Sequence, residues 1–146
     1  MAMSTLLELI TASADETEAA GERLGRTLRG GDLLLLAGDL GAGKTTLVRG
    51  LARGLGVSGA VQSPTFQLVR VHPGPIPLAH VDLYRLESAA ELGELGLEEM
   101  LEEGVVVIEW GSRLVDPPGR SGRLDIEPLG PDSRRLRLLG PAGWRI

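Results

Sequence analysis

The sequence predicts an α/β fold, in which a central mixed sheet of about seven strands is flanked by helices in three layers. Two short apolar blocks carry most of this prediction, 32–37 (DLLLLA) and 105–108 (VVVI), because neither alternates polar with apolar residues. Such blocks are typical of strands covered on both faces, as in the centre of an α/β sheet. The third observation is that segments with helical periodicity lie between the apolar blocks.

The chain begins with a predicted strand followed by a helix. Residues 5–10 are mostly apolar and predict a short first strand. Ser13 and Glu16 have the spacing of a capping box, which predicts a helix over 14–29. Gly30-Gly31 closes this predicted helix, because glycine accepts the left-handed conformation at a helix end. The first of the two apolar blocks follows directly.

After that block, a glycine-rich turn at 38–43 leads into a predicted helix at 44–55. Residues 66–71 alternate in strand fashion, and 78–83 form a second strand pattern. The segment between them, 73–77 (PGPIP), is rich in turn-forming residues. We therefore expect the two strands to pair as an antiparallel hairpin.

The remaining segments predict a helix, a central strand and a second hairpin. Residues 88–103 have a helical pattern, and the second apolar block follows them. A Pro-Pro-Gly sequence at 117–119 is expected to interrupt regular secondary structure. Beyond it, 123–127 and 134–139 are expected to form the final hairpin. These elements complete the predicted sheet.

The length and composition favour one domain, residues 1–146, with its own hydrophobic core. The chain has no cysteine, which excludes disulfide frameworks and thiol chemistry, and its two histidines are too few for most zinc sites. A net charge of −5 argues against broad electrostatic binding of nucleic acid. The N-terminus lacks a basic region followed by an apolar stretch, so we expect a cytoplasmic protein.

Lysine is used only once in the chain. The fifteen basic residues comprise fourteen arginines and Lys44. A compact ammonium group on a flexible stem is not equivalent to a planar guanidinium. The single use of lysine therefore indicates that the site of Lys44 requires an ammonium group.

Lys44 lies in a complete phosphate-loop motif, GxxxxGK(S/T), between a predicted buried strand and a predicted helix. Glycines allow the backbone N–H groups to surround a phosphate, and the helix N-terminus faces the same anion. Lys44 is expected to reach the terminal phosphates, and the Thr45 hydroxyl suits Mg²⁺. The motif predicts a P-loop NTPase-like fold that binds a nucleoside triphosphate. The residues expected to hold the nucleotide here are Gly38, Asp39, Leu40, Gly41, Ala42, Gly43, Lys44, Thr45 and Thr46.

Two acidic residues are candidates for the second metal ligand of such a site. Asp82 follows LAHV, and Glu109 follows the more apolar VVVI, which suits a position beside the phosphate-loop strand. We favour Glu109 as the metal partner and Asp82 as the residue that positions water. The alternatives are a turn carboxylate for Asp82 and a surface ion pair for Glu109. His80 shares a strand face with Asp82 and suits a structural or a catalytic role equally.

Trp110 directly follows Glu109. One interpretation of this tryptophan is an ordinary core residue, and the other is a contact with the base or a switch role.

In these residues the chain resembles the TsaE family, the small P-loop ATPases of tRNA threonylcarbamoyladenosine (t6A) biosynthesis in bacteria. The resemblance rests on five segments in order: SADET at 13–17, GDLGAGKTTL at 38–47, SPTF at 63–66, HVDLYRL at 80–86 and VIEW at 107–110.

The resemblance implies slow Mg²⁺-dependent ATP hydrolysis in concert with a TsaB–TsaD heterodimer. This complex modifies adenosine 37 of tRNAs that read codons beginning with A, so the link to tRNA is indirect. Thr45 and Glu109 would be magnesium ligands, and Asp82 would be needed for hydrolysis. Ser63 and Thr65 would belong to a nucleotide-sensing switch. Arg134 or its neighbour Arg135 would approach the nucleotide.

Two other functions use the same loop. A small metabolite or nucleoside kinase needs an acceptor pocket and a lid, for which 146 residues leave little room. A regulatory module would bind nucleotide without significant turnover. No NKxD-type guanine signature is present, and the preference for adenine rests on the resemblance.

The segment 87–103 carries seven glutamates and no basic residue. Such a run is commonly a solvated helix face. The alternative is an acidic surface that docks a basic patch on a partner.

Overall fold

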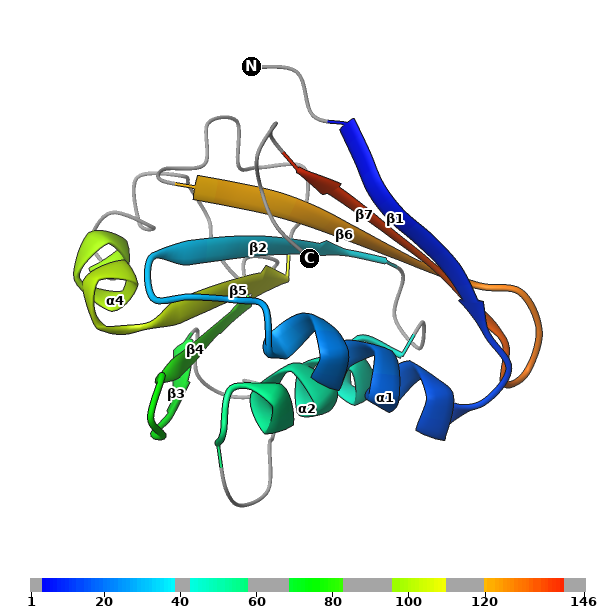
Figure 1. Cartoon of the computed structure of the whole chain (residues 1–146), viewed down its shortest axis with the longest axis horizontal. Coiled ribbons are helices and arrows are strands. Elements are labelled where there is room, and N and C mark those ends of the chain that lie inside the picture. The colour runs from blue at the N-terminus through cyan, green and yellow to red at the C-terminus, as the bar shows by residue number, and fades with distance from the viewer. Residues whose placement is uncertain (1–3, 39–42, 58–68, 83–95, 110–119, 141–146) are drawn as a thin grey trace.

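The structure is a computed structural model, and it describes residues 4–38, 43–57, 69–82, 96–109 and 120–140. Within these ranges, seven strands form one mixed sheet and three helices cover it (Figure 1). The strands are β1 (Ser4–Thr11), β2 (Asp32–Ala37), β3 (Val69–His72), β4 (Leu78–Asp82), β5 (Val105–Glu109), β6 (Arg120–Pro128) and β7 (Arg134–Gly140). The helices are α1 (Ala14–Gly25), α2 (Lys44–Gly54) and α4 (Leu97–Glu103).

The order of the strands in the sheet is β1-β7-β6-β2-β5-β4-β3. The four central strands, β6, β2, β5 and β4, are parallel to one another, since β2 pairs with both β6 and β5, and β5 pairs with β4. The outer pairs β1–β7, β6–β7 and β3–β4 are antiparallel. Both predicted hairpins are therefore confirmed, and so is the central position of the two apolar blocks.

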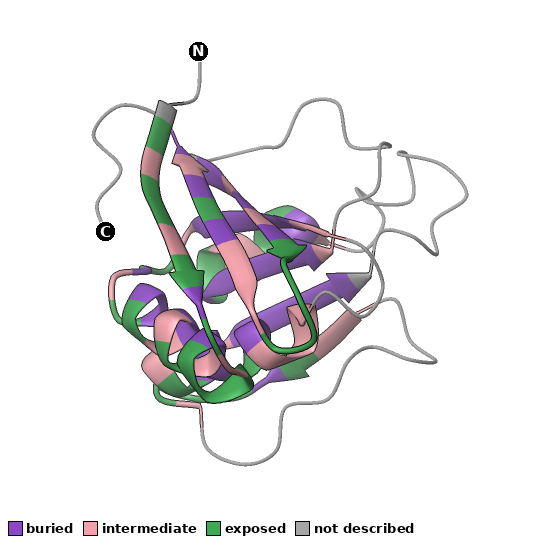
Figure 2. Cartoon of the chain, turned by 90° about the vertical axis from the view of Figure 1, so that its right-hand side faces the viewer, coloured by how far each residue is buried: buried purple, intermediate pink, exposed green. Residues whose placement is uncertain are grey.

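The two faces of the sheet hold separate core clusters, which makes three layers. Leu34, Leu36, Val105 and Val107 pack on the face covered by α1 and α2. The alternating residues of the same strands, such as Leu33 and Leu35, pack against α4 on the other face. Figure 2 shows buried residues along the central strands and on the inner sides of α1 and α2. The predicted α/β fold class is confirmed.

The first helix is shorter than predicted. The prediction that it reaches Arg29 was wrong, because α1 ends at Gly25 and the chain continues in tighter turns. The N–H of Thr27 donates to Leu24 O at 3.0 Å, and the N–H of Leu28 donates to Gly25 O at 3.3 Å. The Asp32 carboxylate then accepts from the N–H of Arg29 at 2.8 Å. These bonds turn the chain toward β2 before Gly30.

Helices α1 and α2 lie side by side and cross at glycines (Figure 1). A Cβ atom at Gly21 would lie 2.5 Å from the carbonyl oxygen of Leu47. A Cβ atom at Gly50 or Gly54 would overlap the carbonyl oxygen of Glu18 or Glu22, respectively. The two backbones therefore touch directly. This contact fixes the first turns of both helices relative to each other.

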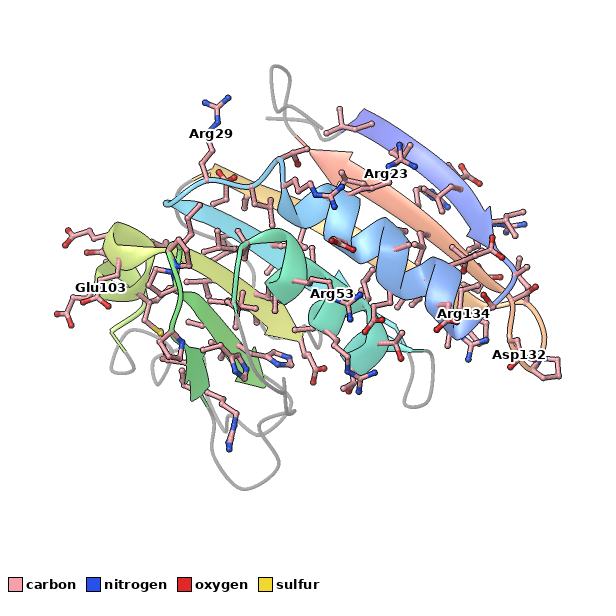
Figure 3. All side chains as sticks on the ribbon, turned by 60° about the horizontal axis from the view of Figure 1, so that its bottom comes forward. Arg23, Arg29, Arg53, Glu103, Asp132 and Arg134 are labelled. Carbon is pink, nitrogen blue, oxygen red and sulfur yellow. The ribbon has the colours of Figure 1, made fainter. Side chains whose placement is uncertain are left out.

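Ion pairs border this crossing. Arg53 lies 3.3 Å from Glu18 and 3.9 Å from Glu22, and Figure 3 shows its side chain between the two helices. These side chains are partly exposed, so each pair contributes at most about 1 kcal/mol. The backbone contact is the dominant constraint on the crossing.

Among the helices that the structure describes, none has the length and apolar character needed to span a membrane.

Candidate functional site

The strand before the phosphate loop is buried except at its last residue, and the helix after it starts where the motif places its lysine. Leu33, Leu34 and Leu36 of β2 are each 0% exposed. Gly43 is the N-cap of α2, with φ +99° and ψ +20°, and its carbonyl accepts from the N–H of Leu47 at 3.0 Å. This left-handed conformation requires glycine. Asp39, Leu40, Gly41 and Ala42 lie outside the described residues.

The start of α2 differs from that of α1. Helix α1 is capped by the Ser13 hydroxyl, which accepts from the N–H of Glu16 at 3.1 Å, and its first turn holds Asp15 and Glu16. Helix α2 has no side-chain cap and no acidic residue in its first turn. Its first N–H groups and its positive dipole end therefore favour an external anion. The first turn carries Lys44 and Thr45.

A pocket lies beside this helix start. It is lined by Ala14 and Thr17 of α1, by Gly43 and Thr46 of the loop and α2, and by Pro131, Asp132 and Arg134 of the last hairpin. Figure 3 shows Asp132 and Arg134 at the tip of that hairpin, next to the first turn of α1. The structure thus brings three predicted site residues, Gly43, Thr46 and Arg134, to one cavity.

The Arg134 side chain is held in place by its own turn. Its Nη1 donates to Ser133 O at 2.8 Å and to Gly130 O at 3.1 Å. A Cβ atom on Gly43 would lie 3.3 Å from Arg134 Nε, so the guanidinium approaches the loop closely. The Arg134 guanidinium therefore brings a positive charge to the pocket beside the helix start, which Asp132 also lines.

Four residues of this pocket were missed by sequence reasoning: Ala14, Thr17, Pro131 and Asp132. Thr17 is 1% exposed, and its hydroxyl shares a 2.6 Å hydrogen bond with that of Thr11. Thr11 pairs with Arg134 across β1 and β7. The segment SADET at 13–17 was the available signal, but its place beside the last hairpin depends on this long-range pairing.

The two acidic candidates end neighbouring strands. Asp82 and Glu109 are register partners across the parallel β4–β5 pair, and Glu109 is level with Leu36 near the end of β2. Strand β5 thus occupies the position beside the phosphate-loop strand, as predicted. The structure describes the backbone of Asp82 but not its side chain.

The Glu109 carboxylate lies next to basic groups. Its Oε1 is 3.4 Å from Nε2 of His80, which is 0% exposed. Burial alone would raise the pKa of Glu109, but the close polar contact with His80 and the attraction of His80 and Lys44 outweigh it, so the pKa of this carboxyl is lowered. Glu109 is therefore ionised at neutral pH beside the predicted phosphate position.

These groups fit a magnesium ion. Mg²⁺ takes hard oxygen ligands and usually keeps several waters and substrate phosphate oxygens. An ionised Glu109 carboxylate and the Thr45 hydroxyl supply such oxygens. Within the described ranges no cluster of three or more acidic or histidine side chains could hold a metal alone.

The remaining predicted site residues, Ser63, Thr65 and Trp110, lie outside the described residues. Gly38 is described and directly follows β2.

A second buried histidine, His72, predicts a pH dependence of stability. It is 7% exposed, and its Nε2 has no hydrogen-bond partner among the described residues. Burial lowers its pKa below the ordinary 6.5, and repulsion by His80 and Arg70 lowers it further. Below pH 6.5 the unfolded chain therefore binds a proton that the folded chain resists. Stability should fall as the pH decreases from 7 toward the folded pKa of His72, by at most about 1.4 kcal/mol per pH unit for this one group.

Urea unfolding of the wild type and of His72→Gln at several pH values between 5 and 8 measures this effect. The variant should have the shallower dependence, and above pH 7 the difference in stability between the two proteins should stay constant. Equal slopes in both proteins would contradict the prediction.

Together, the sheet order, the buried strand, the loop motif and the uncapped helix start define the class: this is an α/β protein with a P-loop NTPase-like fold. The sequence profile described as "Threonylcarbamoyl adenosine biosynthesis protein TsaE" matches residues 11–136. The chain belongs to the TsaE family.

Several relatives carry the same description. The tRNA threonylcarbamoyladenosine biosynthesis protein TsaE of Streptomyces coelicolor is 55% identical over 123 residues, which cover 81% of this chain and 75% of that protein. The TsaE of Treponema pallidum is 42% identical and covers 90% of this chain and 99% of its own length. The crystal structure of Bacillus subtilis YdiB superposes with a TM-score of 0.76 at 32% identity, covering 96% of this chain and 88% of that one.

Proposed function

We propose that the chain is a small Mg²⁺-dependent ATPase that acts with a TsaB–TsaD heterodimer. Together they would form N6-threonylcarbamoyladenosine at position 37 of tRNAs that read codons beginning with A. Family membership supports the pathway. The observation that carries the ATPase proposal is the position of Glu109, an ionised carboxylate at the end of the strand beside the phosphate-loop strand.

In this proposal, the residues of the chain bind and orient the nucleotide. The N–H groups at the start of α2 and the Lys44 ammonium hold the phosphates and stabilise the charge that develops on them. Arg134 adds positive charge at the pocket beside the loop. Asp82, at the end of β4, orients the attacking water. Mg²⁺, held by Thr45 and Glu109, would neutralise charge on the phosphate oxygens.

The test is phosphate release from ATP by the purified chain, without any acceptor, before and after addition of TsaB–TsaD. We expect slow release alone and a change in rate with the heterodimer. ADP formation that requires a small-molecule acceptor would identify a kinase instead. Tight ATP binding without release, even with the heterodimer, would identify a regulatory module.

A magnesium titration should distinguish the roles of the two acidic residues. Both Glu109→Ala and Asp82→Ala should lose hydrolysis and keep the fold. Only Glu109→Ala should raise the Mg²⁺ concentration needed for half-maximal nucleotide binding, by more than about tenfold, because only this change removes a metal ligand. If Asp82→Ala raises that concentration instead, the two assignments are reversed.

The acidic segment gives this proposal a candidate docking surface. Of its residues, the structure describes α4, in which Glu98, Glu99, Glu102 and Glu103 are exposed. Exposure is compatible with a solvated face as well as with docking, so the contact with a basic patch on the heterodimer stays a hypothesis.

A further inference from the structure

His80 is a polar side chain in a place where the fold favours an apolar one. It lies in the middle of β4, its side chain is 0% exposed, and β3 and β5 pair on either side of its strand. Leu78, two residues earlier on the same face, is equally buried. Neither ring nitrogen of His80 has a well-aligned hydrogen bond among the described residues. Because burying an unsatisfied polar ring is unfavourable, His80 calls for an explanation.

The polar contact that His80 does make is with Glu109. Nε2 lies 3.4 Å from Oε1, which is a close approach with loose alignment. His80 pairs in register with Val107, so the ring reaches diagonally to Glu109, one position further along the same face of β5. This direction leads toward the ends of the strands, where α2 begins.

The strand that carries Glu109 is enclosed on both sides, whereas the Glu109 side chain lies at its end. Strand β5 is held between β2 and β4, and Val105 and Val107 are each 0% exposed. Glu109 is the last residue of β5, and its side chain is 12% exposed. A small part of this side chain is therefore open to the site and is not enclosed by the protein. A donor on Oε1 limits the rotation of the carboxylate and leaves Oε2 for the site. Outer partners of this kind orient metal ligands in many proteins.

We propose that His80 is a positioning residue, which donates Nε2–H to Oε1 of Glu109 and so aims the other carboxylate oxygen at the magnesium ion of a bound nucleotide. This inference rests on the proposed function, in which Glu109 is a metal ligand. It assigns His80 no contact with the nucleotide or the metal. The alternative is a buried histidine that only fills space.

Three substitutions at one position separate these roles. His80→Gln places an amide nitrogen near the position of Nε2, His80→Asn places one near Nδ1, and His80→Leu removes both donors. The matched control is His72→Gln, which alters the other buried histidine on the neighbouring strand β3. Each protein is examined by thermal unfolding and by titration with a fluorescent ATP analogue, in EDTA and in increasing Mg²⁺.

We expect binding in EDTA to be unchanged in all variants. The Mg²⁺ concentration for half-maximal binding should rise about 10- to 100-fold in His80→Asn and His80→Leu. It should stay close to the wild-type value in His80→Gln and His72→Gln. An increase in His80→Gln equal to that in His80→Leu, or no increase in any variant, would overturn the inference. If Mg²⁺ does not strengthen nucleotide binding to the wild type, the proposed function fails and the inference fails with it.

A measurement on the unmutated ring keeps the inference testable even if the variants unfold. The chain has two histidines, so ¹⁵N-histidine spectra of the wild type and His72→Gln assign the His80 signals. We expect His80 to carry its proton on Nε2, and we expect that signal to shift when Mg²⁺ is added to the ADP complex. A neutral ring protonated on Nδ1 alone would overturn the inference.

Discussion

Lys44→Ala is expected to lower the affinity for ATP by about a hundredfold or more, which corresponds to at least about 2.7 kcal/mol. The first turn of α2 has no acidic residue, so this turn adds no negative charge at the predicted phosphate position. Removing the Lys44 ammonium leaves phosphate charge without its main counter-charge in a partly buried site. Isothermal titration calorimetry with ATP and Mg²⁺ measures the change.

The control is Arg49→Ala, which removes a positive charge from the same helix. The Arg49 side chain is 49% exposed and lies 3.9 Å from Glu18, on the side of α2 that faces α1. Its loss should change the ATP affinity by less than about threefold, since exposed charges are screened. Equal effects of the two substitutions would mean that Lys44 acts only through net charge, and an unchanged affinity in Lys44→Ala would remove the main support for nucleotide binding.

Gly50→Ala is expected to destabilise the fold by about 2 kcal/mol, although alanine favours a helix over glycine by about 1 kcal/mol. The added Cβ atom would overlap the backbone carbonyl of Glu18, and a backbone cannot rotate aside as a long side chain can. The helices must therefore separate, which loosens the core between them. A decrease in melting temperature of about 4–8 °C is expected for a domain of this size.

Gly30→Ala is the matched control for this change. A Cβ atom at Gly30 would meet no atom within 4 Å, and Gly30 does not have a positive φ. Its substitution should leave stability unchanged or raise it by up to about 1 kcal/mol, because alanine restricts the unfolded chain. If Gly50→Ala is as stable as Gly30→Ala, the close contact of α1 and α2 does not constrain the fold.

The sequence was sufficient to predict those elements that are recognisable from their own residues alone. The blocks 32–37 and 105–108 are recognisable as buried strands from their own residues, and both lie in the centre of the sheet. The glycine that ends the loop has the conformation that the motif requires, with φ +99° at Gly43. In contrast, the capping box located the start of α1, while the predicted end at Arg29 was wrong because tighter turns replace the helix after Gly25.

The parts of the site that depend on register could not be predicted. His80 and Asp82 share a face by simple alternation, but the contact between His80 and Glu109 requires the alignment of β4 with β5. The same is true of the pocket wall formed by Thr17 and Arg134. That wall exists because β1 pairs with β7 from opposite ends of the chain. The pattern of a strand identifies its buried face but not the distant strand with which it pairs.

The glycine crossing of α1 and α2 has a mechanical consequence for the pocket. The first turns of these helices, with Thr17 and Thr46, form two sides of it, and their backbones touch further along. The two helices therefore form one rigid wall of the pocket. The opposite wall of the pocket is the exposed hairpin tip that bears Asp132 and Arg134. The helix wall is therefore held by backbone contact, and the wall opposite it is held by the pairing of β7 with β1 and β6.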